Sequence, residues 1–131
     1  MIMLVEPIEK VKEGYALYAE RNFPAIFELF ADNITVWQTS QLPWGGEYSG
    51  RDGAGEFFTK LAQYTAATPV PVAFVPAGRH VAVCGKLRGK ATATDAEFDL
   101  DFVHLWQVTD GKIDRFEAFV DTPAMLRALG L

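Results

Sequence analysis

The sequence is poor in the residues that several common classes of protein require. Its 131 residues include one cysteine, Cys84, which excludes an internal disulfide framework and a multi-cysteine zinc site. Lysine and arginine number 12 against 17 aspartates and glutamates, so the formal net charge is −5. A domain this acidic lacks the basic surface that binds a phosphate backbone, and we expect no nucleic-acid partner.

Long hydrophobic runs are missing as well. No stretch approaches the roughly 18 consecutive apolar residues of a transmembrane helix. The apolar stretch before Glu6 is shorter than the hydrophobic region of a secretory signal peptide. We therefore expect a cytoplasmic protein with no membrane partner. The sequence has no HExxH or GxSxG motif, and nothing in it predicts a metal site or a cofactor.

Aromatic residues are the most informative feature that is present. The chain has 10 phenylalanines, 4 tyrosines and 3 tryptophans, and each such side chain can bury about 150–250 Å² of surface. A single domain of this length, half of it apolar, can be stable even if part of its interior stays unfilled. This composition permits a cavity for a small apolar molecule.

The hydrophobic pattern predicts an α+β fold in which helices gather on one side of an antiparallel sheet. Ile8, Val11, Tyr15 and Tyr18 recur at helical spacing, and Pro7 can begin that helix. The remaining expected elements are a second helix around 26–30, a strand over 34–40, a glycine-rich loop over 43–53, a helix around 57–64, strands over 70–75, 79–92, 97–108 and 112–121, and a closing helix over 122–130.

The last two strands can be placed in register, because Asp110-Gly111 predicts a two-residue hairpin turn. This register pairs His104 with Glu117. One face would then pack under the helices, and it carries Asp101, Val103, Leu105, Phe116, Ala118 and Val120. The opposite face would carry Phe102, His104, Trp106, Arg115, Glu117, Phe119 and Asp121. Its mixture of aromatic and charged side chains suits a polar pocket or a homodimer interface at the open sheet face.

Three segments carry a resemblance to a known family: LFADNITVWQ (29–38), PWGGEYSGRDGAGEFF (43–58) and HLWQVTDGKIDRFEAFVDTPAML (104–126). They resemble the nuclear transport factor 2-like superfamily, specifically its SnoaL-like polyketide cyclase and ketosteroid isomerase-related branch. The resemblance implies one domain over residues 1–131. It also implies a cone-shaped α+β barrel in which a curved antiparallel sheet wraps around a long N-terminal helix, with a deep pocket and often a dimer.

The resemblance also implies catalysis by buried carboxylates, but this chain lacks them at the matching positions. Gln38 stands where the isomerase has its general-base aspartate, and Val103 stands where it has its oxyanion-hole aspartate. Ala118 lies at or beside the position of the carboxylate that cyclases and epoxide hydrolases carry on the last strand. Tyr15 lies next to the position of the oxyanion tyrosine. Amide, alkyl and methyl groups cannot transfer a proton as a carboxylate does, so steroid isomerisation by the known mechanism is disfavoured.

Three residues remain as candidate acid–base groups. His104 and Glu117 form the best-defined pair, since a carboxylate across the hairpin would orient and charge the imidazole; the alternative is a polar patch at a dimer interface. Asp101 is the other candidate, as a base beside apolar neighbours. Asp95, Glu97, Asp99 and Asp101 alternate, however, and such a row typically marks a strand face exposed to water.

The candidate ligand-binding residues are aromatic, aliphatic or amide side chains: Tyr15, Tyr18, Trp37, Gln38, Trp44, Phe58, Val103, Phe116, Ala118 and Val120. For the two tyrosines the alternative is an ordinary place in the helix core. Two classes of function follow from the sequence. One is an isomerase-, cyclase- or hydratase-type enzyme that transfers protons on an apolar or polycyclic carbonyl compound. The other is a non-catalytic binding or dimeric interaction domain with the same pocket.

Overall fold

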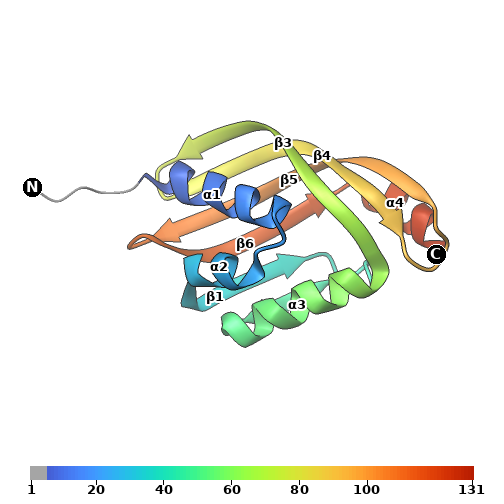
Figure 1. The fold of residues 1–131 in the computed structure, drawn as a ribbon, viewed down its shortest axis with the longest axis horizontal. Helices are drawn as coiled ribbons and strands as arrows, with labels where there is room; N and C mark the ends of the chain where they lie inside the picture. The colour runs from blue at the N-terminus through green and yellow to red at the C-terminus, as the bar shows by residue number, and fades with distance from the viewer. Residues whose placement is uncertain (1–5) are drawn as a thin grey trace, which may run out of the picture.

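The computed structural model describes residues 6–131, so the apolar stretch considered above as a signal peptide lies outside the described residues. Four helices and six strands follow one another along this part of the chain (Figure 1). Their order is α1 (Pro7–Ala19), α2 (Phe23–Leu29), β1 (Phe30–Gln38), β2 (Gly46–Ser49), α3 (Gly50–Tyr64), β3 (Thr65–Ala77), β4 (His80–Ala91), β5 (Glu97–Thr109), β6 (Lys112–Val120) and α4 (Thr122–Leu129). Within residues 6–131 no helix has the length and apolar character needed to span a membrane.

The six strands form one curved sheet in the order β2-β1-β6-β5-β4-β3. The α+β class predicted from the sequence is confirmed. All neighbouring strands are antiparallel except β1 and β6, which are parallel, so the sheet is mixed. β1 and β6 are far apart in the sequence and no hairpin joins them, so no turn constrains them to run in opposite directions.

Helices α1, α2 and α3 lie over one face of the sheet, and α4 packs near one end of β4 and β5 (Figure 1). Local signals fix the helix ends. Pro7 begins α1, and the side chain of Asn22 caps α2 by accepting a hydrogen bond from the Ala25 N–H at 3.3 Å. Asp121 caps α4 in the same way, and Gly130 ends it with φ of +78°. The closing helix is therefore confirmed over the expected residues.

The glycine-rich stretch 43–53 is only partly the loop that was expected. It contains the short strand β2, and α3 already begins at Gly50. Gly53 lies so close to β2 that a Cβ atom there would be 3.3 Å from the backbone carbon of Tyr48. The glycines of this stretch thus allow the first turn of α3 to lie directly against the preceding strand, which propensity alone does not reveal.

A β-bulge in the last hairpin changes the predicted register. Thr109 pairs with Lys112 as expected, but the pairing shifts by one residue at Asp114, which is the extra residue of β6. Beyond the bulge, His104 pairs with Ala118 rather than with Glu117, so the predicted His104–Glu117 pair is wrong. A shift of one residue exchanges the faces of a strand. Phe102, His104 and Trp106 therefore share a face with Phe116 and Ala118, beneath the helices.

Candidate functional site

The space between the helices and the sheet contains a cavity of about 80 Å³. Nine of the predicted site residues lie in its wall: the acid–base candidate His104 and the ligand-binding candidates Tyr15, Tyr18, Gln38, Trp44, Phe58, Phe116, Ala118 and Val120. One water molecule needs roughly 10–15 Å³ by the same kind of measure. The cavity is therefore large enough for several waters or a small organic ring.

Four predicted site residues lie outside this cavity. The side chain of Asp101 is 83% exposed and forms an ion pair with Lys86 at 2.7 Å. Glu117 binds Arg115 at 2.8 Å on the opposite face of the sheet, which we call the outer face. Val103 is 42% exposed on the same face. The bulge accounts for Asp101 and Val103, because it places the odd-numbered residues of β5 on the outer face. Glu117 lies on the face that the sequence predicted for it, but without His104 beside it.

Trp37 is the fourth of these residues, and a different feature places it on the outer face. It lies on β1 between Val36 and Gln38, both of which are buried. Since neighbouring side chains of a strand point to opposite faces, Trp37 is directed away from the cavity. Its ring packs against Phe119 with 5.3 Å between ring centroids.

The cavity also contains residues that the sequence analysis did not single out. They come from α2, α3, the four strands β3 to β6, and α4, and include Ile26, Phe57, Leu61, Pro69, Leu87, Trp106, Ile113 and Met125. Trp106 was assigned to the wrong face through the hairpin register. The alternation within β5 itself points to the correct face, because the acidic Glu97, Asp99 and Asp101 are all odd-numbered.

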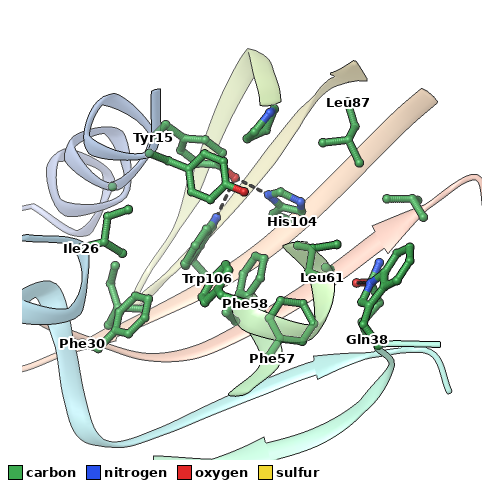
Figure 2. Close-up of a pocket in the computed structure, with 18 of the residues that line it drawn as sticks. Tyr15, Ile26, Phe30, Gln38, Phe57, Phe58, Leu61, Leu87, His104 and Trp106 are labelled. Carbon is green, nitrogen blue, oxygen red and sulfur yellow. Dashed lines mark hydrogen bonds between the residues drawn. The ribbon is translucent and has the colours of Figure 1, made fainter. Parts of the chain in front are cut away.

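A chain of hydrogen bonds crosses one wall of the cavity (Figure 2). The Trp106 indole Nε1–H donates to the Tyr15 hydroxyl oxygen at 2.9 Å. A second hydrogen bond, of 2.6 Å, joins the Tyr15 hydroxyl and His104 Nδ1. His104 and Trp106 are two residues apart on β5 and therefore face the same way, while α1 brings Tyr15 across to meet them.

Aromatic rings enclose His104 and keep it uncharged. Its ring centroid is 4.2 Å from that of Phe102 and 5.0 Å from that of Phe116, and the Tyr15 ring stacks beside it at 5.9 Å. Burial lowers the pKa of His104 to about 3. Burial likewise raises the pKa of Tyr15 above its usual range. Both side chains are therefore neutral at physiological pH.

Gln38 provides a second polar group in the cavity wall. It is buried, and its side-chain oxygen accepts a hydrogen bond from the Trp44 indole Nε1–H at 2.7 Å. No aspartate, glutamate, lysine or arginine of the described residues lines the cavity. The cavity can thus hold an uncharged molecule and form hydrogen bonds to it. It offers no carboxylate for proton abstraction.

The buried, neutral state of His104 has a measurable effect on stability. Below pH 6.5 the unfolded chain takes up a proton on His104, whereas the folded chain does not until about pH 3. The unfolded state then binds more protons, so this contribution to stability is complete above pH 6.5 and is lost as the pH falls toward 3. The slope is up to about 1.4 kcal/mol per pH unit.

We expect His104→Gln to remove this slope. Urea unfolding of both proteins between about pH 4 and 7 measures it, because the titration of the carboxylates is common to both and cancels in the difference. The free energy of unfolding of the wild type minus that of His104→Gln should become smaller as the pH falls. A difference independent of pH would mean that His104 titrates in the folded protein as it does in the unfolded chain.

Comparison with known proteins places the chain in a structural context. The sequence profile of a family described as the SnoaL-like domain matches residues 11–116. None of the curated proteins compared with the chain matches it. An NTF2-like protein from Burkholderia thailandensis is 26% identical with a TM-score of 0.89, the match covering 96% of this chain and 98% of that one.

Two further solved structures are similar over nearly their whole length. An NTF2-like protein of unknown function from Burkholderia pseudomallei is 23% identical with a TM-score of 0.90, and the match covers 98% of this chain and 100% of that one. TerC, co-crystallised with polyporic acid, is 25% identical with a TM-score of 0.87, and the match covers 95% of this chain and 98% of that one.

Proposed function

The chain belongs to the SnoaL-like domain family, and from that premise we propose that it binds a small, uncharged, apolar carbonyl compound in the cavity and promotes proton transfer next to the carbonyl group. The observation that carries this proposal is a neutral, buried His104 in an aromatic cavity whose described lining residues include no charged side chain. A charged ligand would lose its hydration there without gaining an ion pair, which disfavours it.

Neutral hydrogen-bonding groups can still act on a carbonyl group. A neutral imidazole with a lowered pKa can polarise a carbonyl by donating a hydrogen bond to its oxygen. Such a donor stabilises the negative charge that develops on the oxygen when the neighbouring C–H loses its proton. The described cavity residues offer no carboxylate, so water accepts that proton in this proposal. His104 or Gln38 holds the oxygen.

A deuterium-exchange experiment tests the proposal with a compound of the proposed class. We expect the protein to bind 1-tetralone and to increase exchange of its α-protons for deuterium in D₂O by at least about tenfold over buffer, a modest effect for acid–base catalysis. ¹H NMR follows the exchange. His104→Leu removes the donor and should abolish the effect, whereas Glu117→Gln on the outer face should leave it unchanged.

The same experiment separates two functions. Binding of 1-tetralone without accelerated exchange would favour a non-catalytic binding domain, which the absence of a cavity carboxylate among the described residues also supports. No binding of 1-tetralone would contradict the proposal. Equal loss of exchange in His104→Leu and Glu117→Gln would show that the cavity is not the reactive site.

We also propose that the outer face pairs with a second copy of the chain. Val103 and Phe119 are 42% and 44% exposed there, and Trp37 packs beside Phe119. The neighbouring Arg115 is paired with Glu117 at 2.8 Å and with Glu47 at 3.5 Å, so it presents no unpaired positive charge to a second copy. We expect a dimer in sedimentation equilibrium and a monomer for Phe119→Lys. A monomeric wild-type protein at concentrations up to about 100 µM, a modest affinity, would exclude this proposal.

A further inference from the structure

Two tryptophans in the cavity wall make the same kind of hydrogen bond. The indole N–H of Trp44 donates to Gln38 Oε1 at 2.7 Å, and that of Trp106 donates to the Tyr15 hydroxyl oxygen at 2.9 Å. An indole N–H can donate but cannot accept. Each tryptophan therefore engages an acceptor atom of a polar cavity residue, and the direction of each hydrogen bond is fixed by chemistry.

For Gln38, the consequence concerns the orientation of its amide. The amide has an accepting oxygen at one end and two N–H donors at the other. Trp44 fixes which end of the amide is the oxygen, and no described residue accepts a hydrogen bond from the NH₂ group, so the two N–H groups are free to donate to a ligand. Gln38 lies on the wall opposite α1, across the cavity from Tyr15 (Figure 2).

For His104, the consequence concerns the position of its ring proton. The Tyr15 oxygen already accepts from Trp106, and the single Tyr15 proton needs an acceptor. The acceptor within 2.6 Å is His104 Nδ1. If Nδ1 carried the ring proton instead, the buried Tyr15 hydroxyl proton would have no partner among the described residues. The neutral ring therefore carries its proton on Nε2, the nitrogen directed away from Tyr15 (Figure 2).

We infer that Trp44 and Trp106 determine the hydrogen-bonding specificity of the cavity: they leave Gln38 and His104 as donors, so that the site selects ketones, diketones or quinones over the corresponding alcohols and phenols. Tyr18 is the remaining polar side chain of the cavity wall. Its hydroxyl both donates and accepts, so it favours neither class. The ligand preference rests on the proposed function, whereas the position of the His104 proton does not.

The preference has a simple physical basis. A ketone oxygen accepts hydrogen bonds from either donor and leaves no polar atom unpaired. An alcohol can accept from the same donors, but its own hydroxyl proton then finds no acceptor at Gln38 or His104. An unpaired buried donor weakens binding by about ten- to a hundredfold. We expect a preference of this size for 1-tetralone over 1-tetralol, which share one bicyclic skeleton.

The first test uses the ligand-free protein. A two-dimensional ¹H–¹⁵N NMR spectrum can correlate the carbon-bound protons of a histidine ring with both ring nitrogens. The ¹⁵N chemical shifts then identify which nitrogen carries the proton. The chain has two histidines, so His104→Gln assigns the spectrum. We expect the His104 proton on Nε2 in the wild-type protein at neutral pH. A proton on Nδ1 would overturn the inference whatever the protein binds.

The second test compares the two ligands in variants. In Trp44→Phe the Gln38 amide is free to turn and present its oxygen, so the preference for 1-tetralone over 1-tetralol should fall to about twofold or less, against about tenfold or more in the wild type. NMR titration of the Met125 methyl group, which lies in the cavity wall, gives both affinities. Trp37→Phe on the outer face is the matched control and should keep the wild-type preference.

The outcomes distinguish this inference from the proposed function. Failure of both compounds to bind the wild type would contradict the proposed function and, with it, the ligand preference. Binding of both compounds with equal affinity, or an unchanged preference in Trp44→Phe, would overturn the inference while leaving the proposed function intact. If Trp44→Phe fails to fold, Gln38→Leu and Tyr18→Phe in the wild-type background provide the same comparison: the first should reduce the preference and the second should keep it.

Discussion

Replacing Ala118 by phenylalanine is expected to lower the affinity of the protein for 1-tetralone by at least about 100-fold, because the new ring would occupy the cavity. Ala118 is buried, lies on β6 directly opposite His104, and contributes a small side chain to the cavity wall. Overpacking costs about 1–3 kcal/mol in a filled core. Here it is offset by contacts with the rings that surround the empty space, so the protein should remain folded.

Isothermal titration calorimetry measures the affinity, and thermal unfolding checks the fold. Val103→Phe is the matched control, because it adds a ring on the outer face at a residue that is 42% exposed. The control should bind 1-tetralone as the wild type does. Retained affinity in Ala118→Phe would show that the ligand binds elsewhere, and lost affinity in both variants would point to an indirect effect of the added ring.

The second large effect concerns a glycine in the sheet. Gly85→Ala is expected to reduce the free energy of unfolding by at least about 3 kcal/mol, in the long tail of single-substitution effects. A Cβ atom at Gly85 would be 2.2 Å from the backbone oxygen of Val70 and 2.8 Å from the ring of Phe102. A backbone oxygen cannot move aside as a flexible side chain can, so β3 and β4 would have to separate next to the bulge in β3.

Gly14→Ala is the matched control for this substitution. Gly14 lies inside α1, and a Cβ atom there would meet only a Leu29 methyl group at 3.9 Å. Alanine favours a helix over glycine by about 1 kcal/mol, so this variant should be more stable than the wild type. Urea unfolding of both variants measures the change in free energy of unfolding, which should be a decrease for Gly85→Ala and an increase for Gly14→Ala. A neutral Gly85→Ala would mean that β3 and β4 are not in such close contact in solution.

The elements of the fold could be predicted because their ends carry local signals. Pro7, Asn22-Phe23-Pro24 and Thr122-Pro123 announce helix starts, and Asp110-Gly111 announces the last hairpin. The parallel pairing of β1 with β6 could not be predicted in this way. It joins segments about 80 residues apart, and no turn in the sequence between them predicts the pairing.

The faces of the last hairpin show why the candidate site was only partly predictable. The turn correctly predicted that Thr109 pairs with Lys112, but the bulge at Asp114 has no glycine or proline that would mark it. Counting pairs from the turn therefore placed His104 beside Glu117. The acidic residues at odd-numbered positions of β5 predict the opposite face for His104. If they are exposed to water, the even-numbered His104 must face inward. The burial of β5 follows the acidic alternation.

Most candidate ligand-binding residues lie together in the cavity wall, whereas the candidate acid–base pair is separated, again for a physical reason. Apolar and aromatic side chains such as Phe58 and Phe116 lie in the interior of almost any fold with this pattern, and the cavity is part of that interior. A specific pair requires the correct register to within one residue. The contact between Tyr15 and His104 spans 89 positions and depends on how α1 crosses the sheet, which periodicity does not specify.

A crystal structure of the protein with 1-tetralone bound would show whether the cavity is the carbonyl-binding site. We expect the bicyclic ring between α1 and the sheet, near Phe58 and Phe116, with the ketone oxygen about 2.7–3.2 Å from Gln38 Nε2 or His104 Nε2. A ring bound on the outer face beside Trp37, or a ketone oxygen directed away from both donors, would contradict this expectation.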